Sequence, residues 1–234
     1  NASCEPEIVA LGGMLNRMGA RISGLGTPYI TVEGVARLRG VSETILPDRL
    51  EAGTYAVAAA ITGGRIELEN VRAADMLPVT SKLKDAGVPV WLSDSSMLIE
   101  TGAKLNAIEI QTLPFPGFPT DLQAPFAVLM TQAQGVSKLK ERIFDDRLRY
   151  TDELARMGAH VEIKKYEASP GEISYGNEVT ITGPTRLHGE EVKALDIRAG
   201  AGVVLAGLVA EGESIITDVK HIDRGYDGFV RNLR

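Results

Sequence analysis

The sequence is poor in cysteine, histidine and aromatic residues. Its 234 residues include one cysteine, Cys4, and three histidines, and aromatic side chains make up 5% of the chain. A single cysteine excludes an internal disulfide, which favours a reducing, cytoplasmic setting. His160, His188 and His221 lack the spacing of a metal-ligand set, so we expect structural histidines and neither a metal nor another cofactor.

A long hydrophobic run and an excess of basic residues are also missing. The most apolar stretch, residues 199–210, is too short and too rich in glycine to cross a bilayer. No signal-peptide pattern opens the chain. The 25 Lys and Arg and 31 Asp and Glu residues are interspersed and leave a net charge of −6. We therefore expect neither a membrane protein nor a nucleic-acid-binding protein, although a few converging arginines would suffice for an anionic substrate.

What the chain does contain is one segment in three copies. Each copy has an Asp shortly before a run of small and apolar residues, and each run ends at a glycine: Asp48 to Gly63, Asp121 to Gly135, and Asp196 to Gly212. The aspartates are 73 and 75 residues apart. A repeat of this length is a whole folding unit.

Each run predicts a helix that begins at its Asp, whose carboxylate can cap the free N–H groups there. The runs are apolar on all sides, so these helices are expected to be buried. Pro125 predicts a late start or a bend in the second helix. The surface helices and strands predicted after these runs cover residues 65–69, 76–87, 88–92, 97–101, 137–143, 150–159, 161–165, 178–182 and 213–219.

The repeat unit therefore reads β-α-β-α-β-β, an α/β (α+β) arrangement. Residues 8–33 repeat its second half, so the chain begins and ends within a unit and is expected to be part of something longer. Three units can pack their apolar helices together with the sheets outside. The three helix starts would then meet at one end, where their positive dipoles favour an anion.

Several strings closely resemble one family, the UDP-N-acetylglucosamine (UDP-GlcNAc) 1-carboxyvinyltransferases, also called UDP-GlcNAc enolpyruvyl transferases. The resemblance spans essentially the whole chain. In chain order, the strings are Glu5-Pro6-Glu7-Ile8, Leu46-Pro47-Asp48-Arg49, Phe118-Pro119-Thr120-Asp121-Leu122-Gln123-Ala124, Arg156-Met157-Gly158-Ala159-His160, Asp196-Ile197-Arg198-Ala199 and His221-Ile222-Asp223-Arg224-Gly225-Tyr226.

The resemblance implies two domains, each an inside-out α/β barrel of three repeats, with the active site in the cleft between them. This chain resembles the C-terminal portion of such an enzyme. Residues 1–45 would be the last repeat unit of the first domain. Residues 46–234 would be the three-repeat second domain, truncated at its C-terminus.

The resemblance also implies a reaction. The family transfers the enolpyruvyl group of phosphoenolpyruvate to the 3′-hydroxyl of UDP-GlcNAc and releases phosphate, through addition and then elimination. This is the first committed step of peptidoglycan synthesis, and it takes place in the cytoplasm without a cofactor. The implied partners are the two substrates and the missing N-terminal half of the same enzyme, without which the fragment is expected to lack turnover.

Two residues match the family's catalytic positions. Asp121 matches the Asp that contacts the 3′-hydroxyl and is the candidate general base. Its alternative role is an ordinary helix cap. Arg224 matches the Arg that the family places on phosphoenolpyruvate, because a guanidinium suits a phosphate or carboxylate. Its alternative role is a surface salt bridge.

The remaining candidates would bind substrate. Asp196 and Arg198 match an active-site pair, or form a cap and a local ion pair. Asp48 and Glu5 match carboxylates of the cleft, with capping or a hinge as the alternatives. Near the sugar nucleotide the family uses two further positions, which correspond here to the side chain of Arg147 and the backbone of Ile143; either could be a plain strand-end residue.

Two other functions remain open. The shikimate-pathway enolpyruvyl transferase shares the fold, but the Leu-Pro-Asp-Arg and His-Ile-Asp-Arg-Gly-Tyr strings argue against it. A non-catalytic repeat scaffold that binds a nucleotide sugar or a protein is the second alternative. Cys4 occupies a variable spot, whereas the family's reactive cysteine lies on a loop absent here, so we take Cys4 as incidental.

Overall fold

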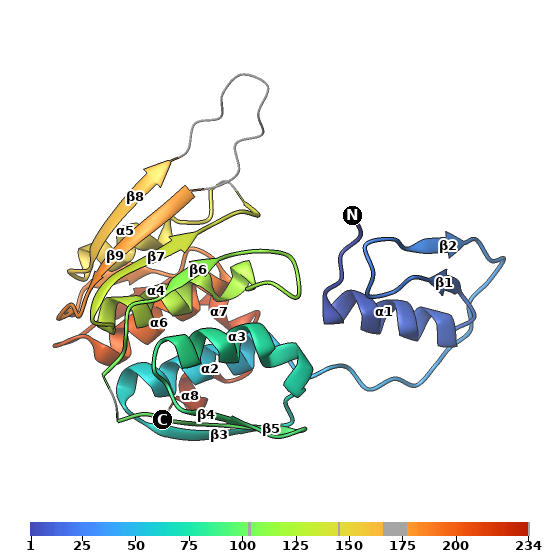
Figure 1. Cartoon of the computed structure of the whole chain (residues 1–234), viewed down its shortest axis with the longest axis horizontal. Coiled ribbons are helices and arrows are strands. Elements are labelled where there is room, and N and C mark those ends of the chain that lie inside the picture. The colour runs from blue at the N-terminus through green and yellow to red at the C-terminus, as the bar shows by residue number, and fades with distance from the viewer. Residues whose placement is uncertain (103, 145, 166–176, 234) are drawn as a thin grey trace.

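The computed structural model describes residues 1–102, 104–144, 146–165 and 177–233. Residues 1–33 form a small N-terminal unit, and residues 49–233 form a larger body. Residues 34–48 join the two and contain no helix or strand. Figure 1 shows the N-terminal unit set apart from the body at the far end of this connection.

The N-terminal unit is one helix packed on two short strands. Helix α1 (Pro6–Arg17) is followed by strands β1 (Arg21–Ser23) and β2 (Thr31–Glu33), which pair antiparallel. Proline is well suited to the first turn of a helix, where its missing N–H is not needed. The order of helix and two strands agrees with the prediction, although the helix ends three residues before the predicted Ala20.

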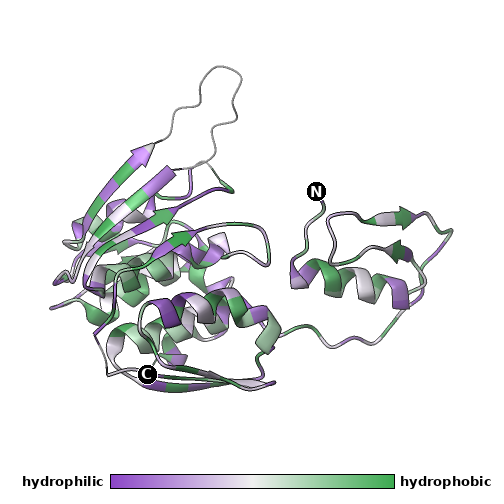
Figure 2. Ribbon diagram, in the orientation of Figure 1, coloured by the Kyte–Doolittle hydropathy of each residue, from purple (hydrophilic) through white to green (hydrophobic). Residues whose placement is uncertain are grey.

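Three buried helices occupy the centre of the body: α2 (Arg49–Thr62), α4 (Gln123–Gln132) and α6 (Ile197–Val209). Each contacts the other two, and Figure 2 shows apolar residues gathered on them. Small residues allow this close approach, because a Cβ on Gly202 would lie 3.0 Å from the Cβ of Ala124. The predicted core of three apolar helices is thus confirmed.

Sheets and shorter helices surround this core (Figure 1). One sheet has the order β3-β5-β4, a second has the order β6-β7-β9-β8, and β10 pairs with β11. The pairs β6–β7 and β10–β11 are parallel, and the other strand pairs are antiparallel. The strands are β3 (Arg65–Glu69), β4 (Val90–Leu92), β5 (Ser96–Glu100), β6 (Glu109–Gln111), β7 (Gly135–Lys140), β8 (His160–Lys165), β9 (Asn177–Gly183), β10 (Glu191–Lys193) and β11 (Ile215–Thr217). The other helices are α3 (Ala73–Asp85), the 3₁₀ turn η1 (Thr120–Leu122), α5 (Tyr150–Arg156), α7 (Lys220–Asp223) and α8 (Phe229–Asn232).

The second repeat contains the whole predicted unit, in the order β6, α4, β7, α5, β8, β9. In the described residues of the first repeat, no strand precedes α2. The third repeat has β10, α6 and β11, and then the short helices α7 and α8. The β-α-β-α-β-β reading is therefore complete in one copy and partial in the other two.

Two predicted boundaries need correction. The strand predicted over residues 137–143 ends at Lys140, and the second buried helix begins at Gln123 rather than at Asp121. Pro125 has no N–H to donate to the carbonyl of Asp121, four residues earlier. The chain therefore enters α4 through the 3₁₀ turn η1, which is the late start that Pro125 predicted.

Candidate active site

The starts of the three buried helices meet at one end of the body. Leu122, in η1, is fully buried against the first turns of α2, and a Cβ on Gly53 would lie 2.5 Å from its Cδ1. Ala124 lies in the same way against Gly202 of α6. The regions that follow Asp48, Asp121 and Asp196 are therefore neighbours in space, as the repeat predicted.

Two of these three aspartates cap their helices. The side chain of Asp48 accepts hydrogen bonds from the N–H groups of Leu50 (2.8 Å) and Glu51 (3.0 Å). The side chain of Asp196 accepts from the N–H groups of Arg198 and Ala199, both at 2.8 Å. Both carboxylates thus satisfy N–H groups that a helix start leaves free.

The third aspartate, Asp121, does not cap its helix, which corrects the reading of all three as equivalent. Its Oδ1 accepts a hydrogen bond from Nη1 of Arg147 at 2.8 Å, and its Oδ2 lies 3.9 Å from Nε of Arg198. Its side chain is 31% exposed. A carboxylate held between two guanidinium groups and open to solvent can act on a ligand as a base or an acceptor.

Arg147 is held from two further sides. Its Nη1 also donates to Oγ1 of Thr120 (3.2 Å), and its guanidinium lies 4.5 Å from the ring centroid of Phe144. Cation–π contacts of this kind favour a fixed guanidinium plane. Arg147 therefore belongs to the site, as predicted from the resemblance, and its first partner there is Asp121.

Arg198 faces the same place from α6. Its side chain is 18% exposed, and its Nη1 is buried without a hydrogen-bond partner. The guanidinium lies 5.5 Å from the ring centroid of Tyr226, whose hydroxyl is 2.9 Å from Oγ1 of Thr54 on α2. An unpaired guanidinium nitrogen at a helix start suits a bound anion.

The pKa values of two groups around Arg198 are raised. Burial raises the pKa of Tyr226 above its ordinary value, against the hydrogen bond to Thr54 and the charge of Arg198. Burial also raises the pKa of Glu51, and the charges of Asp48 and Asp227 add to this while Arg198 opposes it. The rim of the site that includes Asp48 is therefore acidic, whereas its centre carries the arginines.

Glu5 lies instead where the N-terminal unit meets the body. Its Oε1 accepts from the N–H of Phe115 at 3.2 Å. Burial alone would raise the pKa of Glu5, but the hydrogen bonds from Ser3 and Phe115 and the charge of Arg49 bring it below its ordinary value. The structure does not place Glu5 among the side chains around Asp121 and assigns it to a contact between two parts of the chain.

The same contact contains the ion pair of Glu7 and Arg49. Nε of Arg49 donates to Oε1 of Glu7 at 2.8 Å, and its Nη2 to Oε2 at 3.3 Å. Arg49 is buried, with its guanidinium 5.6 Å from the ring centroid of Phe115. Sequence reasoning missed both residues as functional, although they stand in the quoted Glu-Pro-Glu-Ile and Leu-Pro-Asp-Arg strings.

The structure leaves the roles of Ile143 and Arg224 as predictions. The N–H of Ile143 donates to Oε1 of Glu141 at 2.6 Å, so its carbonyl is the backbone group left for a ligand. Arg224 is exposed and forms no ion pair with another described residue. Its neighbour Gly225 packs on Ile197 at the start of α6, which brings Arg224 to the same end of the body.

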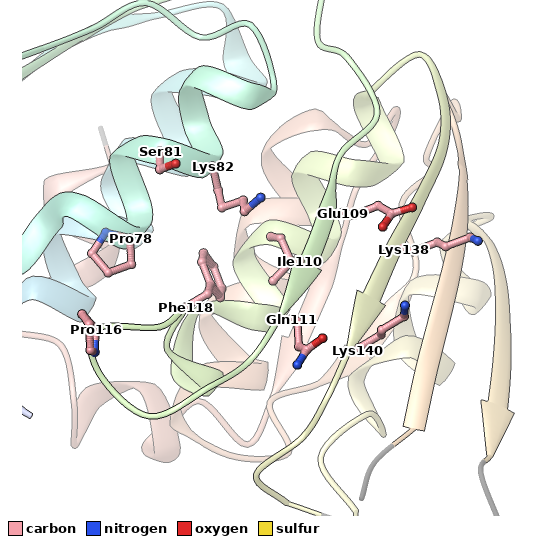
Figure 3. Close-up of a pocket in the computed structure, with 10 residues that line it drawn as sticks. All are labelled: Pro78, Ser81, Lys82, Glu109, Ile110, Gln111, Pro116, Phe118, Lys138 and Lys140. Atoms are coloured by element: carbon pink, nitrogen blue, oxygen red, sulfur yellow. The ribbon is translucent and has the colours of Figure 1, made fainter. Parts of the chain in front are cut away.

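A separate cavity of about 480 Å³ lies between α3 and the edge of the second sheet. Figure 3 shows Lys82 of α3 on one side and Gln111 and Lys140 of the strands on the other. None of the residues predicted for catalysis or binding lines it. We place the candidate site at Asp121 rather than here, because the arginines converge there.

Other functional classes receive no structural support. Within the part of the chain that the structure describes, no three His, Cys, Asp or Glu side chains gather as a metal site would need. Among the same residues, no helix combines the length and apolar character of a membrane span. Cys4 is half buried, with its Sγ 3.8 Å from the carbonyl of Ala2.

Sequence relatives agree on one family name. The chain is 45% identical over 234 residues to UDP-N-acetylglucosamine 1-carboxyvinyltransferase 1 of Caldanaerobacter subterraneus subsp. tengcongensis, covering all of this chain and 54% of that one. It is 44% identical to UDP-N-acetylglucosamine 1-carboxyvinyltransferase 2 of Geobacillus kaustophilus, covering 52% of that protein. The chain thus spans about half the length of the curated relatives it matches.

Solved structures agree on the fold. The enolpyruvyl transferase NikO from Streptomyces tendae superposes with a TM-score of 0.79 at 22% identity, over 94% of this chain and 50% of that one. EPSP synthase from Acinetobacter baumannii superposes with a TM-score of 0.65 at 21% identity, over 94% of this chain and 52% of that one. The predicted α/β enolpyruvyl transferase fold is thereby confirmed.

The sequence profile of one family, described as EPSP synthase (3-phosphoshikimate 1-carboxyvinyltransferase), matches residues 1–233. The resemblance to enolpyruvyl transferases is therefore confirmed over nearly every residue. Together with the fold and the names of its relatives, this match shows that the chain belongs to the EPSP synthase family of enolpyruvyl transferases.

Proposed function

We propose that this chain provides one half of the active site of a UDP-GlcNAc 1-carboxyvinyltransferase. The reaction transfers the enolpyruvyl group of phosphoenolpyruvate to the 3′-hydroxyl of UDP-GlcNAc and releases phosphate, the first committed step of peptidoglycan synthesis. The observation that carries the proposal is Asp121, held between Arg147 at 2.8 Å and Arg198 at 3.9 Å where three buried helices begin. The names of the 42–45% identical relatives support the choice of substrate.

Asp121 is proposed as the general base. It would take the proton of the 3′-hydroxyl as the sugar oxygen bonds to C2 of phosphoenolpyruvate, while C3 receives a proton from a donor that we do not assign to this chain. The resulting tetrahedral intermediate then loses the C3 proton and phosphate, which restores the double bond. A positioned base of this kind typically contributes about 10²–10⁴-fold to a rate.

The arginines would bind the charged parts of the substrates. Arg198, with its buried free Nη1, and Arg224, exposed nearby, are proposed to hold the carboxylate and phosphate of phosphoenolpyruvate. Arg147 would lie near the sugar nucleotide and orient Asp121, and the carbonyl of Ile143 would contact the same ligand. Asp196 contributes by capping the helix that presents Arg198.

Asp48 and Glu5 are proposed to line the cleft between two domains. Residues 1–45 would be the last repeat unit of one domain, and residues 46–234 the larger part of the other. The extended segment 34–48 and the contacts of Glu5 and Glu7 with the body support this division. A missing N-terminal half would complete the cleft, and its absence predicts that the 234 residues alone lack turnover. The single cysteine and the substrates fit a cytoplasmic enzyme.

The decisive experiment assays the full-length protein that contains this chain. With UDP-GlcNAc and phosphoenolpyruvate, we expect phosphate release and an enolpyruvyl sugar nucleotide detected by mass spectrometry. Asp121→Asn should reduce kcat by about 10²–10⁴-fold. The matched control is Asp85→Asn, an exposed carboxylate paired with Lys82 on α3, which should keep activity. Equal activity of both variants would refute the role of Asp121.

The description of the matching family favours one other candidate, transfer to shikimate 3-phosphate. The same assay with shikimate 3-phosphate in place of UDP-GlcNAc separates the two. Turnover with the shikimate substrate alone would replace the proposed function. Tight binding of UDP-GlcNAc without turnover by the full-length protein would instead favour a nucleotide-sugar-binding scaffold.

A further inference from the structure

Glu141 is a buried carboxylate that none of the proposed steps uses. It follows β7 directly, and its side chain is completely buried. Taking a carboxylate out of water is costly unless hydrogen bonds replace the lost hydration. The described residues give Glu141 five hydrogen bonds, all from uncharged donors, which marks it as a built feature rather than a chance burial.

The two oxygens of Glu141 organise two different segments. Oε1 accepts from Oγ1 of Thr112 (2.9 Å) and from the N–H groups of Ile143 (2.6 Å) and Phe144 (3.1 Å). These contacts shape the turn that leads to Arg147. Oε2 accepts from Oγ1 of Thr120 (2.7 Å) and Nε2 of Gln123 (2.7 Å), and so holds the turn η1 that carries Asp121.

The hydroxyl of Thr120 connects Glu141 to the candidate base. A hydroxyl has one proton to donate, and the proton of Thr120 points to Glu141 at 2.7 Å. Its oxygen is therefore an acceptor on the other side, where Nη1 of Arg147 lies at 3.2 Å. The same Nη1 donates to Oδ1 of Asp121 at 2.8 Å. A continuous line of hydrogen bonds thus runs from Glu141 through Thr120 and Arg147 to Asp121.

We propose that Glu141 is a positioning residue for the transferase reaction, which sets the orientation of Asp121 and Arg147 through the hydroxyl of Thr120. The proposal rests on the proposed function, since it assigns Asp121 as the base. Glu141 itself touches neither substrate. Its effect should fall on the chemical step, because a displacement of about 1 Å in a catalytic group can cost about 10²-fold in rate.

The test uses Glu141→Gln in the full-length enzyme. Glutamine keeps the size of the side chain but replaces one acceptor oxygen with a donor, so one of the two segments loses its anchor. We expect kcat to fall about 10- to 100-fold, with KM for UDP-GlcNAc and phosphoenolpyruvate changed less than about 3-fold. The matched control, Glu109→Gln on the exposed face of β6, should leave both constants unchanged. A loss confined to KM, or no loss of kcat, would overturn the proposal.

Thr120 provides a second and gentler pair of variants. Thr120→Val removes the hydroxyl and should lower kcat as Glu141→Gln does, whereas Thr120→Ser restores the hydroxyl and should recover most of kcat. The double variant should lose no more than the worse single variant, because both interrupt one line of hydrogen bonds. Losses that multiply, or full activity of Thr120→Val, would overturn the proposal even if Glu141→Gln fails to fold.

A crystal structure of Glu141→Gln or Thr120→Val separates this proposal from the proposed function. Nη1 of Arg147 should move out of hydrogen-bond distance of Asp121, and an unchanged contact would overturn the positioning role. A wild-type enzyme without UDP-GlcNAc transfer would refute the proposed function. The position of Arg147 in the variant would still decide whether Glu141 holds it.

Discussion

Helices α4 and α6 begin with the same residue type in two different roles. At α6, Asp196 accepts two N–H groups and spends its carboxylate on the helix. At α4, Pro125 delays the helix, the turn η1 intervenes, and Asp121 turns its carboxylate to Arg147 instead. The difference teaches that an Asp becomes available for chemistry when the local backbone no longer needs it as a cap.

The largest effect is expected from Arg198, which α6 presents to Asp121. Arg198→Met should lower kcat/KM for phosphoenolpyruvate by about 10- to 100-fold in the full-length enzyme, the range of hydrogen bonds to charged groups. Stability should hold, because its buried Nη1 has no hydrogen bond to lose. Arg186→Met is the control, since the side chain of Arg186 is 84% exposed and pairs with Glu211. A loss below about 3-fold for Arg198→Met would separate α6 from substrate binding.

The close contact of α4 and α6 can be broken at Gly202. Gly202→Leu forces atoms against Ala124, where a Cβ alone would already lie at 3.0 Å. We expect a loss of about 1–3 kcal/mol in the free energy of unfolding, measured in urea. On the same helix, a Cβ on Gly207 would lie 3.6 Å from Ser214, an ordinary contact. Gly207→Ala should therefore leave stability unchanged or higher, and an equal loss at both sites would contradict the packing argument.

The two aspartates themselves should differ in stability. Asp196→Ala removes a cap and should cost about 1 kcal/mol of unfolding free energy, whereas Asp196→Asn keeps an acceptor and should cost far less. Asp121→Ala removes a partly exposed ion pair and should cost less than about 0.5 kcal/mol. Thermal or urea unfolding measures all three variants. An equal cost for the two alanine variants would erase the distinction between the two helix starts.

The smallest effect concerns Glu51, in the first turn of α2. Burial and the charges of Asp48 and Asp227 raise its pKa, so ionising it costs folding free energy as the pH rises from its unfolded pKa through its folded pKa. Glu51→Gln should therefore stabilise the protein by a few tenths of a kcal/mol at pH 7. The gain should vanish below about pH 4, where Glu51 is protonated in both states. The control is Glu67→Gln on the exposed face of β3, and a gain that persists at low pH would contradict the sign.

The repeat made most of the body predictable. Spacing of the three aspartates located the buried helices, and alternation located strands such as β7, where Leu139 is buried between Lys138 and Lys140. Spacing could not show that Asp121 fails to cap, because this depends on how Pro125 reshapes the preceding turn. The site residues came from the resemblance rather than from the pattern.

Glu141 could not have been found in the same way. In the sequence it continues the polar and apolar alternation of Lys138-Leu139-Lys140, so it reads as one more exposed charge on a strand. Its burial arises because β7 ends at Lys140 and Thr112, Thr120 and Gln123 close around it. Those donors come from three other places in the chain, and only the fold brings them together.

The ion pair of Glu7 and Arg49 makes the attachment of the N-terminal unit sensitive to ionic strength. The side chain of Glu7 is 54% exposed, so dissolved ions reach the pair, and the range of its attraction is about 8 Å at physiological salt and about 3 Å at 1 M. The buried core, held by apolar contact, lacks this dependence. Salt should therefore loosen the N-terminal unit before it affects the body, and because Arg49 is the first residue of α2, that loosening begins next to Asp48.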